Sequence, residues 1–157
     1  MIALEPNNAN AFNNRGNAYV AKGDRDSALA DYDRATALNP KLSNAFYNRG
    51  NVHAAKGDRD RAIADYDEAI RLDPGNAGAL NNRGSVHNAK GDRDRAIADF
   101  DRAIALNPNY ANAFYNRGNA YFLSGNRERA MADYDRAIAI NPALDTALVR
   151  ERRNAAR

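Results

Sequence analysis

The chain has 157 residues, of which 44% are hydrophobic, and it contains neither cysteine nor tryptophan. Without cysteine it has no disulfides and no thiolate chemistry, and no apolar run approaches the about 20 residues that span a membrane. The net charge is +3, and the last eight residues hold this excess as four Arg and one Glu. A nucleic-acid binder carries its basic stripe on the folded body, so nucleic acid is not an expected partner. A membrane is not expected either, because the chain has no apolar run of spanning length.

The chain begins with a short segment that resembles the end of a helix. MIALEP matches AIAINP at 137–142. Residues 1–8 are therefore predicted to be the remnant of a preceding repeat. The chain is expected to be either part of a longer array or trimmed at its start. No signal peptide is visible, which favours a cytoplasmic location.

Residues 9–42 contain two helical patterns. The first runs from about Ala9 to Lys22 and ends at Gly23. Asp24 is suited to cap the second helix, whose sequence RDSALADYDRATAL stops before Pro40. The first helix also contains Gly16, which has no side chain and lets the second helix approach.

The same pattern recurs along the whole chain. Three landmarks repeat at intervals of 34 residues: Gly16, Gly50, Gly84 and Gly118; Gly23, Gly57, Gly91 and Gly125; and Pro40, Pro74, Pro108 and Pro142. They define four copies, at 9–42, 43–76, 77–110 and 111–144. Residues 145–157 resemble the first helix of a fifth copy, with Arg152 in place of the glycine. One helix pair cannot bury its apolar face alone, so the copies are predicted to stack into a single array over 1–157 that ends in a C-terminal capping helix.

The period and the order of landmark residues resemble the tetratricopeptide repeat (TPR) family. The matching residues in the first copy are Phe12, Gly16, Tyr19, Ala28, Tyr32, Ala35 and Pro40. The resemblance implies an all-α fold, an α-solenoid in which helix-turn-helix repeats form a right-handed superhelix. It also implies that the first helix of each repeat lines a concave groove, where an extended peptide or a partner's helix binds.

The sequence departs from the family pattern just before the first glycine of each copy. The family usually has a large aliphatic residue there, whereas this chain has Arg15, Arg49, Arg83 and Arg117. Each second helix also carries an aspartate: Asp31, Asp65, Asp99 and Asp133. Each Arg is predicted to pair with the Asp of its own repeat, partly buried between the helices, because the planar guanidinium matches a carboxylate. The alternative is two solvated charges.

The family geometry places an asparagine-rich set of residues in the groove. We call these positions the asparagine-rich face: Asn10, Asn13, Asn14, Asn17, Asn44, Tyr47, Asn48, Asn51, Asn81, Asn82, Ser85, Asn112, Tyr115, Asn116 and Asn119. A carboxamide both donates and accepts, so it can hold a peptide backbone without reading its side chains. The row resembles the asparagine ladder of the O-linked N-acetylglucosamine transferases, and Tyr47 and Tyr115 are candidate anchors. Alternatively, Asn14 and its equivalents bond to the adjacent repeat and hold the array together.

Another TPR subtype does not match. Carboxylate-clamp repeats, which bind chaperone C-termini, carry cations where this chain has Asn13, Gly78 and Asn82. Capture of a C-terminal carboxylate is therefore not expected.

No catalytic or cofactor motif is present. His53 and His87 take the places of Tyr19 and Tyr121 in the repeat and are predicted to be packed helix residues. No phosphate-binding loop or calcium loop occurs, so no metal, no cofactor and no enzyme activity are expected. The sequence favours a protein- or peptide-binding scaffold. The alternatives are an assembly module that self-associates end to end, and a substrate-recruiting arm of a larger enzyme.

Overall fold

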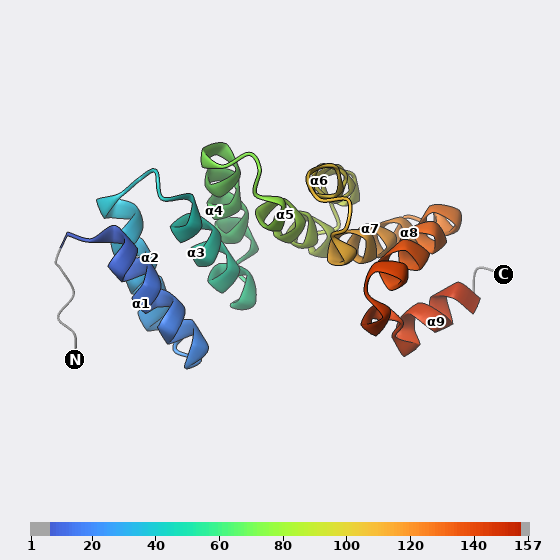
Figure 1. Ribbon diagram of the computed structural model, residues 1–157, viewed down its shortest axis with the longest axis horizontal. Helices are drawn as coiled ribbons and strands as arrows, with labels where there is room; N and C mark the ends of the chain where they lie inside the picture. Colours follow the sequence, from blue (N-terminus) through green and yellow to red (C-terminus); the bar gives the residue numbers. More distant parts are fainter. Residues whose placement is uncertain (1–6, 155–157) are drawn as a thin grey trace. The chain divides into compact units, whose positions relative to one another are not determined.

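The computed structural model describes residues 7–154, which form helices joined by short turns and contain no strand (Figure 1). The chain divides into two compact units, Met1–Ala79 and Leu80–Arg157. The boundary falls inside helix α5, Ala77–Ala89. The predicted remnant helix at 1–8 lies mostly outside the described residues, as do the last three residues of the predicted cap. No helix in the described part is both long and apolar enough to cross a bilayer.

The first unit contains two helix pairs. These are α1 (Ala9–Ala21) with α2 (Arg25–Leu38), and α3 (Ser43–Ala55) with α4 (Arg59–Leu72). Each pair turns at a glycine in the left-handed region, Gly23 at φ +80° and Gly57 at φ +81°. The next helix then begins at an aspartate cap, whose carboxylate accepts from a backbone N–H at 3.1 Å for Asp24 and 3.2 Å for Asp58.

Close helix approach at the predicted glycine organises the packing in this unit. A Cβ on Gly16 would lie 2.6 Å from Cε1 of Tyr32, so only glycine leaves room for that ring. Tyr32 and Ala28 are buried together with Val52 of the following pair. The core is thus a thin layer that joins consecutive pairs, as expected where one pair cannot bury its apolar face alone.

The second unit holds the rest of α5 and the helices that follow. These are α6 (Arg93–Leu106), α7 (Ala111–Leu123), α8 (Arg127–Ile140), the 3₁₀ turn η1 (Pro142–Leu144) and α9 (Ala147–Asn154). Phe100 packs here with Ala96 and Ala120 in place of the tyrosine of the other pairs. As predicted, His53 in the first unit and His87 in the second are packed helix residues, each 8% exposed.

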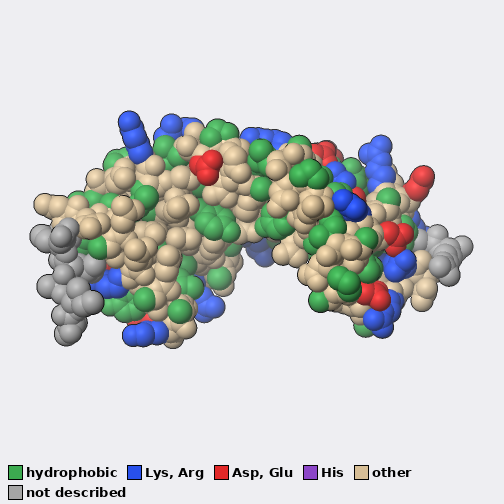
Figure 2. Space-filling view, in the orientation of Figure 1, with side chains coloured by type: hydrophobic (Ala, Val, Ile, Leu, Met, Phe, Trp, Pro, Cys, Tyr) green, Lys and Arg blue, Asp and Glu red, His purple; other side chains and the backbone are tan. Residues whose placement is uncertain are grey.

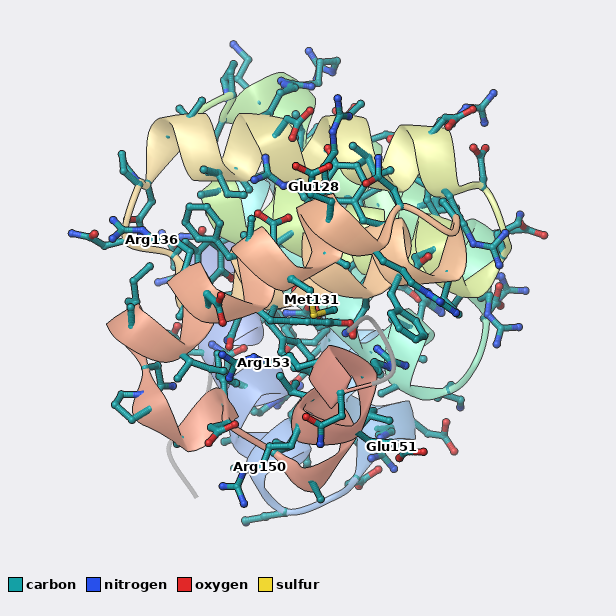
Figure 3. The ribbon with its side chains drawn as sticks, turned by 90° about the vertical axis from the view of Figure 1, so that its right-hand side faces the viewer. Glu128, Met131, Arg136, Arg150, Glu151 and Arg153 are labelled. Atoms are coloured by element: carbon teal, nitrogen blue, oxygen red, sulfur yellow. The ribbon has the colours of Figure 1, made fainter. Side chains whose placement is uncertain are left out.

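The last helix, α9, covers the end of the fourth helix pair. Val149 is 1% exposed and packs against Ala130 and Tyr134 of α8. Figure 3 shows Arg153 on the side of α9 nearer to α8, where it pairs with Asp135 at 2.6 Å, and Arg150 on the outer side. A buried apolar side facing α8 and a charged outer side are the properties of a capping helix.

Candidate functional site

The asparagine-rich face lies on the first helix of each pair: α1 and α3 in the first unit, α5 and α7 in the second. Its positions differ in accessibility. Asn10, Asn44 and Asn112, near the helix starts, are exposed, whereas Asn13 and Asn81 are only 8% and 5% exposed. The last two residues therefore present little surface to a ligand.

The burial of Asn13 and Asn81 has a common cause. In the first unit, Nδ2 of Asn48 donates to Oδ1 of Asn13 at 3.0 Å. In the second unit, Nδ2 of Asn116 donates to Oδ1 of Asn81 at 2.9 Å. Each bond joins the first helices of two consecutive pairs. These contacts support the alternative in which the asparagines two places before the glycine hold neighbouring repeats together.

Tyrosine replaces the buried asparagine in every second pair. The ring of Tyr47 lies 6.2 Å from that of Tyr66, and the ring of Tyr115 lies 6.0 Å from that of Tyr134. Tilted aromatic pairs at such distances contribute about 0.5–1.5 kcal/mol beyond their area burial. The two predicted anchors are half-buried against their own second helix, and only part of each ring remains available to a ligand.

The position after the glycine forms a second kind of contact. The hydroxyls of Tyr32, Tyr66 and Tyr134 donate to the Oδ1 atoms of Asn17, Asn51 and Asn119 at 2.7, 2.8 and 2.8 Å. In the third repeat the asparagine is Ser85 and the tyrosine is Phe100. Ser85 donates instead to the backbone oxygen of Asn81 at 2.9 Å. This joint replacement is visible in the sequence and is the signal by which the contact between tyrosine and asparagine could have been predicted.

A cavity in the first unit brings three candidate residues together. It has a volume of about 250 Å³, and its polar lining includes Asn17, Asn48 and Asn51. Its other lining residues are Tyr32, which sequence analysis named only as a family landmark, and Val20, Arg25, Val52 and Ala55, which it did not single out. Few charged side chains appear over α1 and α3 in Figure 2. The arrangement offers carboxamide groups beside an apolar surface, which suits a peptide segment with one inserted side chain.

Burial also shifts the titration of the tyrosine at this cavity. Desolvation, with a smaller contribution from Asp31, raises the pKa of Tyr32 to about 12. The hydroxyl, which is protonated at neutral pH even at its ordinary pKa of about 10, donates to Asn17. The hydroxyl oxygen and the second lone pair of the Asn17 oxygen remain as acceptors.

The predicted pairing of each arginine with the aspartate of its own repeat is confirmed. The Nη2–carboxylate distances are 2.6 Å for Arg15–Asp31, Arg49–Asp65 and Arg83–Asp99, and 2.7 Å for Arg117–Asp133. Partial burial of the arginine holds for three of them, since 17–20% of the side chain is exposed in Arg49, Arg83 and Arg117. It is wrong for Arg15, which is 45% exposed.

Arg49 and Arg117 also reach the preceding repeat. Arg49 bonds to Asp33 at 2.8 Å in the first unit, and Arg117 bonds to Asp101 at 2.6 Å in the second. Hydrogen bonding to Asp133 is the largest cause that raises the pKa of Arg117 above its ordinary value. The arginines therefore link consecutive helix pairs as well as the two helices of one pair.

A second cavity in the first unit, of about 350 Å³, belongs to this ionic network. Arg49, Asp65 and His53 line it, with Nε2 of His53 at 3.9 Å from Asp65. Within residues 7–154 no group of three or more acidic or histidine side chains could hold a metal ion.

Three family models match the sequence, and all three describe tetratricopeptide repeats. They cover residues 13–77, 85–125 and 111–144. The chain belongs to the tetratricopeptide repeat family. Solved structures of TPR proteins share its fold, which confirms the all-α class and the solenoid architecture. No curated protein sequence matches the chain.

The similar solved structures include several of MamA. One MamA structure has a TM-score of 0.83 and 24% identity and covers 88% of this chain and 81% of its own. Another has a TM-score of 0.79 and 28% identity, with coverages of 85% and 73%. A TPR protein from Parabacteroides merdae has a TM-score of 0.80 and 23% identity, with coverages of 94% and 58%. TPR arrays are generally non-catalytic, and they serve as protein–protein interaction scaffolds; membership of the family makes this chain such an interaction scaffold.

Proposed function

We propose that this TPR chain is a non-catalytic scaffold that binds an extended peptide or partner segment along the asparagine-rich face. The observation that carries the proposal is the cavity in the first unit, where three predicted carboxamides surround an apolar surface formed by Val20, Val52 and Ala55. Val20 is 42% exposed although it is hydrophobic. A side chain from a partner would bury that surface while the carboxamides bond to its backbone.

Not every asparagine has the same role in this proposal. Asn13 and Asn81 connect repeats through their bonds with Asn48 and Asn116. The groups proposed to contact the ligand are the exposed asparagines at the helix starts and the carboxamides that line the cavity. Each peptide hydrogen bond contributes about 0.5–1.5 kcal/mol, so a few such bonds and one apolar insertion give micromolar binding at best.

A pair of matched variants separates binding from architecture. Asn48→Ala and Asn13→Ala break the same inter-repeat hydrogen bond, but only Asn48 lines the cavity. Random-peptide display selections are run on the parent and on both variants after circular dichroism has shown equal helicity. The proposal expects selected peptides to bind the parent and Asn13→Ala, and to lose affinity for Asn48→Ala.

Other outcomes contradict the proposal. If both variants lose binding equally, the asparagines act only through the array. If no peptide binds the parent, the scaffold does not take extended peptides on this face. Sedimentation at increasing protein concentration then tests the alternative that the chain self-associates end to end.

A further inference from the structure

The capping helix places an arginine on the fourth repeat at the site that forms the cavity in the first repeat. Nη1 of Arg152 donates to the hydroxyl oxygen of Tyr134 at 2.8 Å and to Oδ1 of Asn119. Its guanidinium carbon lies 4.8 Å from the centre of the Phe122 ring. The group is held over an aromatic ring and by two neutral acceptors, which suits a guanidinium.

The two acceptors that hold Arg152 have identical counterparts in the first repeat, whereas Val20 stands there in place of the Phe122 ring. Three intervals of 34 residues separate Asn119 from Asn17, Phe122 from Val20, and Tyr134 from Tyr32. In both repeats the tyrosine hydroxyl donates to the asparagine oxygen, at 2.7 Å in the first and 2.8 Å in the fourth. The acceptor pair therefore has the same geometry in both units.

The two sites differ in what occupies them. In the second unit the guanidinium of Arg152 contacts the acceptor pair. In the first unit Asn17, Val20 and Tyr32 line a cavity of about 250 Å³. This volume is below the about 300–1,000 Å³ of small-molecule sites, so it fits one long side chain better than a whole ligand.

We propose that the cavity of the first unit binds the guanidinium group of an arginine side chain on a partner peptide. This rests on the proposed function and names the side chain that the scaffold selects. The guanidinium donates to the Tyr32 hydroxyl oxygen and to Oδ1 of Asn17, as Arg152 does at their counterparts, and its methylenes cover Val20. A lysine ammonium is a compact, strongly hydrated charge. It lacks the fixed planar fork of donors with which a guanidinium contacts both acceptors.

One charge near the cavity works against the proposal. Arg25 lines it and would repel a second cation. Its side chain is exposed, however, so it can turn into solvent at little cost. The fourth repeat has Arg127 at the same position, and Arg152 occupies the acceptor pair there. A cation at this position is therefore compatible with guanidinium binding.

The test compares three peptides on the whole chain. Each is an acetylated, amidated heptapeptide of glycine and serine with arginine, lysine or citrulline at its centre. Binding is followed by NMR at the side-chain amide of Asn17. The arginine peptide is expected to bind about fivefold more tightly than the others, since each extra hydrogen bond to a charged group contributes about 1 kcal/mol or more.

Two variants make the test specific. Tyr32→Phe is expected to remove the preference for arginine, while Tyr134→Phe, which deletes the same kind of hydroxyl–asparagine bond in the second unit, leaves it intact at Asn17. Arg152→Ala exposes the counterpart site, so a second arginine-selective response is expected at Asn119.

The results separate the two proposals. Equal binding of all three heptapeptides, or an arginine preference that survives Tyr32→Phe, would overturn the inference about arginine. The scaffold proposal would still stand if the display selection yields binders without arginine. Failure of every selection would remove the scaffold proposal as well.

Discussion

Removal of the Asp65 carboxylate is the sharpest test of the ionic network. Asp65 is 5% exposed and accepts from Nε of Arg49 at 3.0 Å and from Nη2 at 2.6 Å. Only 20% of the Arg49 side chain is exposed. Asp65→Ala therefore leaves a mostly buried guanidinium without its main partner, and breaking a buried pair in this way costs about 3–5 kcal/mol.

The remaining contacts of Arg49 place the expected loss at the lower end of that range. Arg49 keeps its bonds to Asp33 at 2.8 Å and to Thr36 at 3.1 Å, so the free energy of unfolding should fall by about 3 kcal/mol. For a chain of this size, that corresponds to a drop in Tm of roughly 6–12 °C. Urea denaturation gives the free energy, with a nearest-neighbour analysis because repeat arrays need not unfold in two states.

Two control variants identify the cause of the loss. Asp33→Ala removes the second carboxylate partner of Arg49. The Asp33 side chain is 66% exposed, so its loss should lower the free energy of unfolding by only about 0–1 kcal/mol. The double variant Arg49→Met with Asp65→Leu removes both charges and should recover most of the stability. An Asp65→Ala loss no larger than that of Asp33→Ala would refute the reasoning.

Three further predictions concern Tyr32 and its equivalent in the third repeat, Phe100. Gly16→Ala puts a Cβ 2.6 Å from the Tyr32 ring. It should lower the free energy of unfolding by about 1–2 kcal/mol in urea denaturation, because overpacking outweighs the gain in helix propensity. As a control, Gly75→Ala should be near neutral, since its Cβ would meet only a side-chain oxygen at 3.3 Å. Phe100→Tyr should destabilise alone but regain about 1 kcal/mol when combined with Ser85→Asn, and additive effects in this double-mutant cycle would contradict the pairing. Burial raises the pKa of Tyr32 to about 12, above its value of about 10 in the unfolded chain. The contribution of Tyr32 to the free energy of unfolding is therefore fully present below pH 10 and should decline from about pH 10 towards pH 12. In urea denaturation over this range, Tyr32→Phe should show a smaller decline than the parent.

The sequence was sufficient to predict the helix pairs and the ion pairs, for different physical reasons. Glycine, aspartate and proline mark helix ends wherever they recur, so the period alone locates α1 to α8. The pairing of Arg49 with Asp65 was predictable because a charge at a position that the family buries needs a charged partner.

Other contacts could not be read from residue types. Asparagine is equally suited to a solvated surface and to a buried bond, so nothing in its identity separates Asn10 from Asn13. The difference arises from the stacking of consecutive pairs, which brings Asn48 to Asn13. Stacking also explains why Arg15 is more exposed than Arg49. Within the described residues, Arg49 contacts an aspartate of the preceding repeat and Arg15 does not.

The alternation of asparagine and tyrosine on the first helices links stability to recognition. Asn13 and Asn81 are buried and accept a hydrogen bond from the next pair, while Tyr47 and Tyr115 pack on their own second helices. Side chains that stacking buries are not accessible to a ligand. Selectivity must therefore come from groups that stacking leaves accessible, which in the first unit are the exposed helix starts and the acceptor pair at the cavity. A ligand that reads Asn17 would then leave the repeat-to-repeat bonds intact, so binding and stability can be altered by separate substitutions.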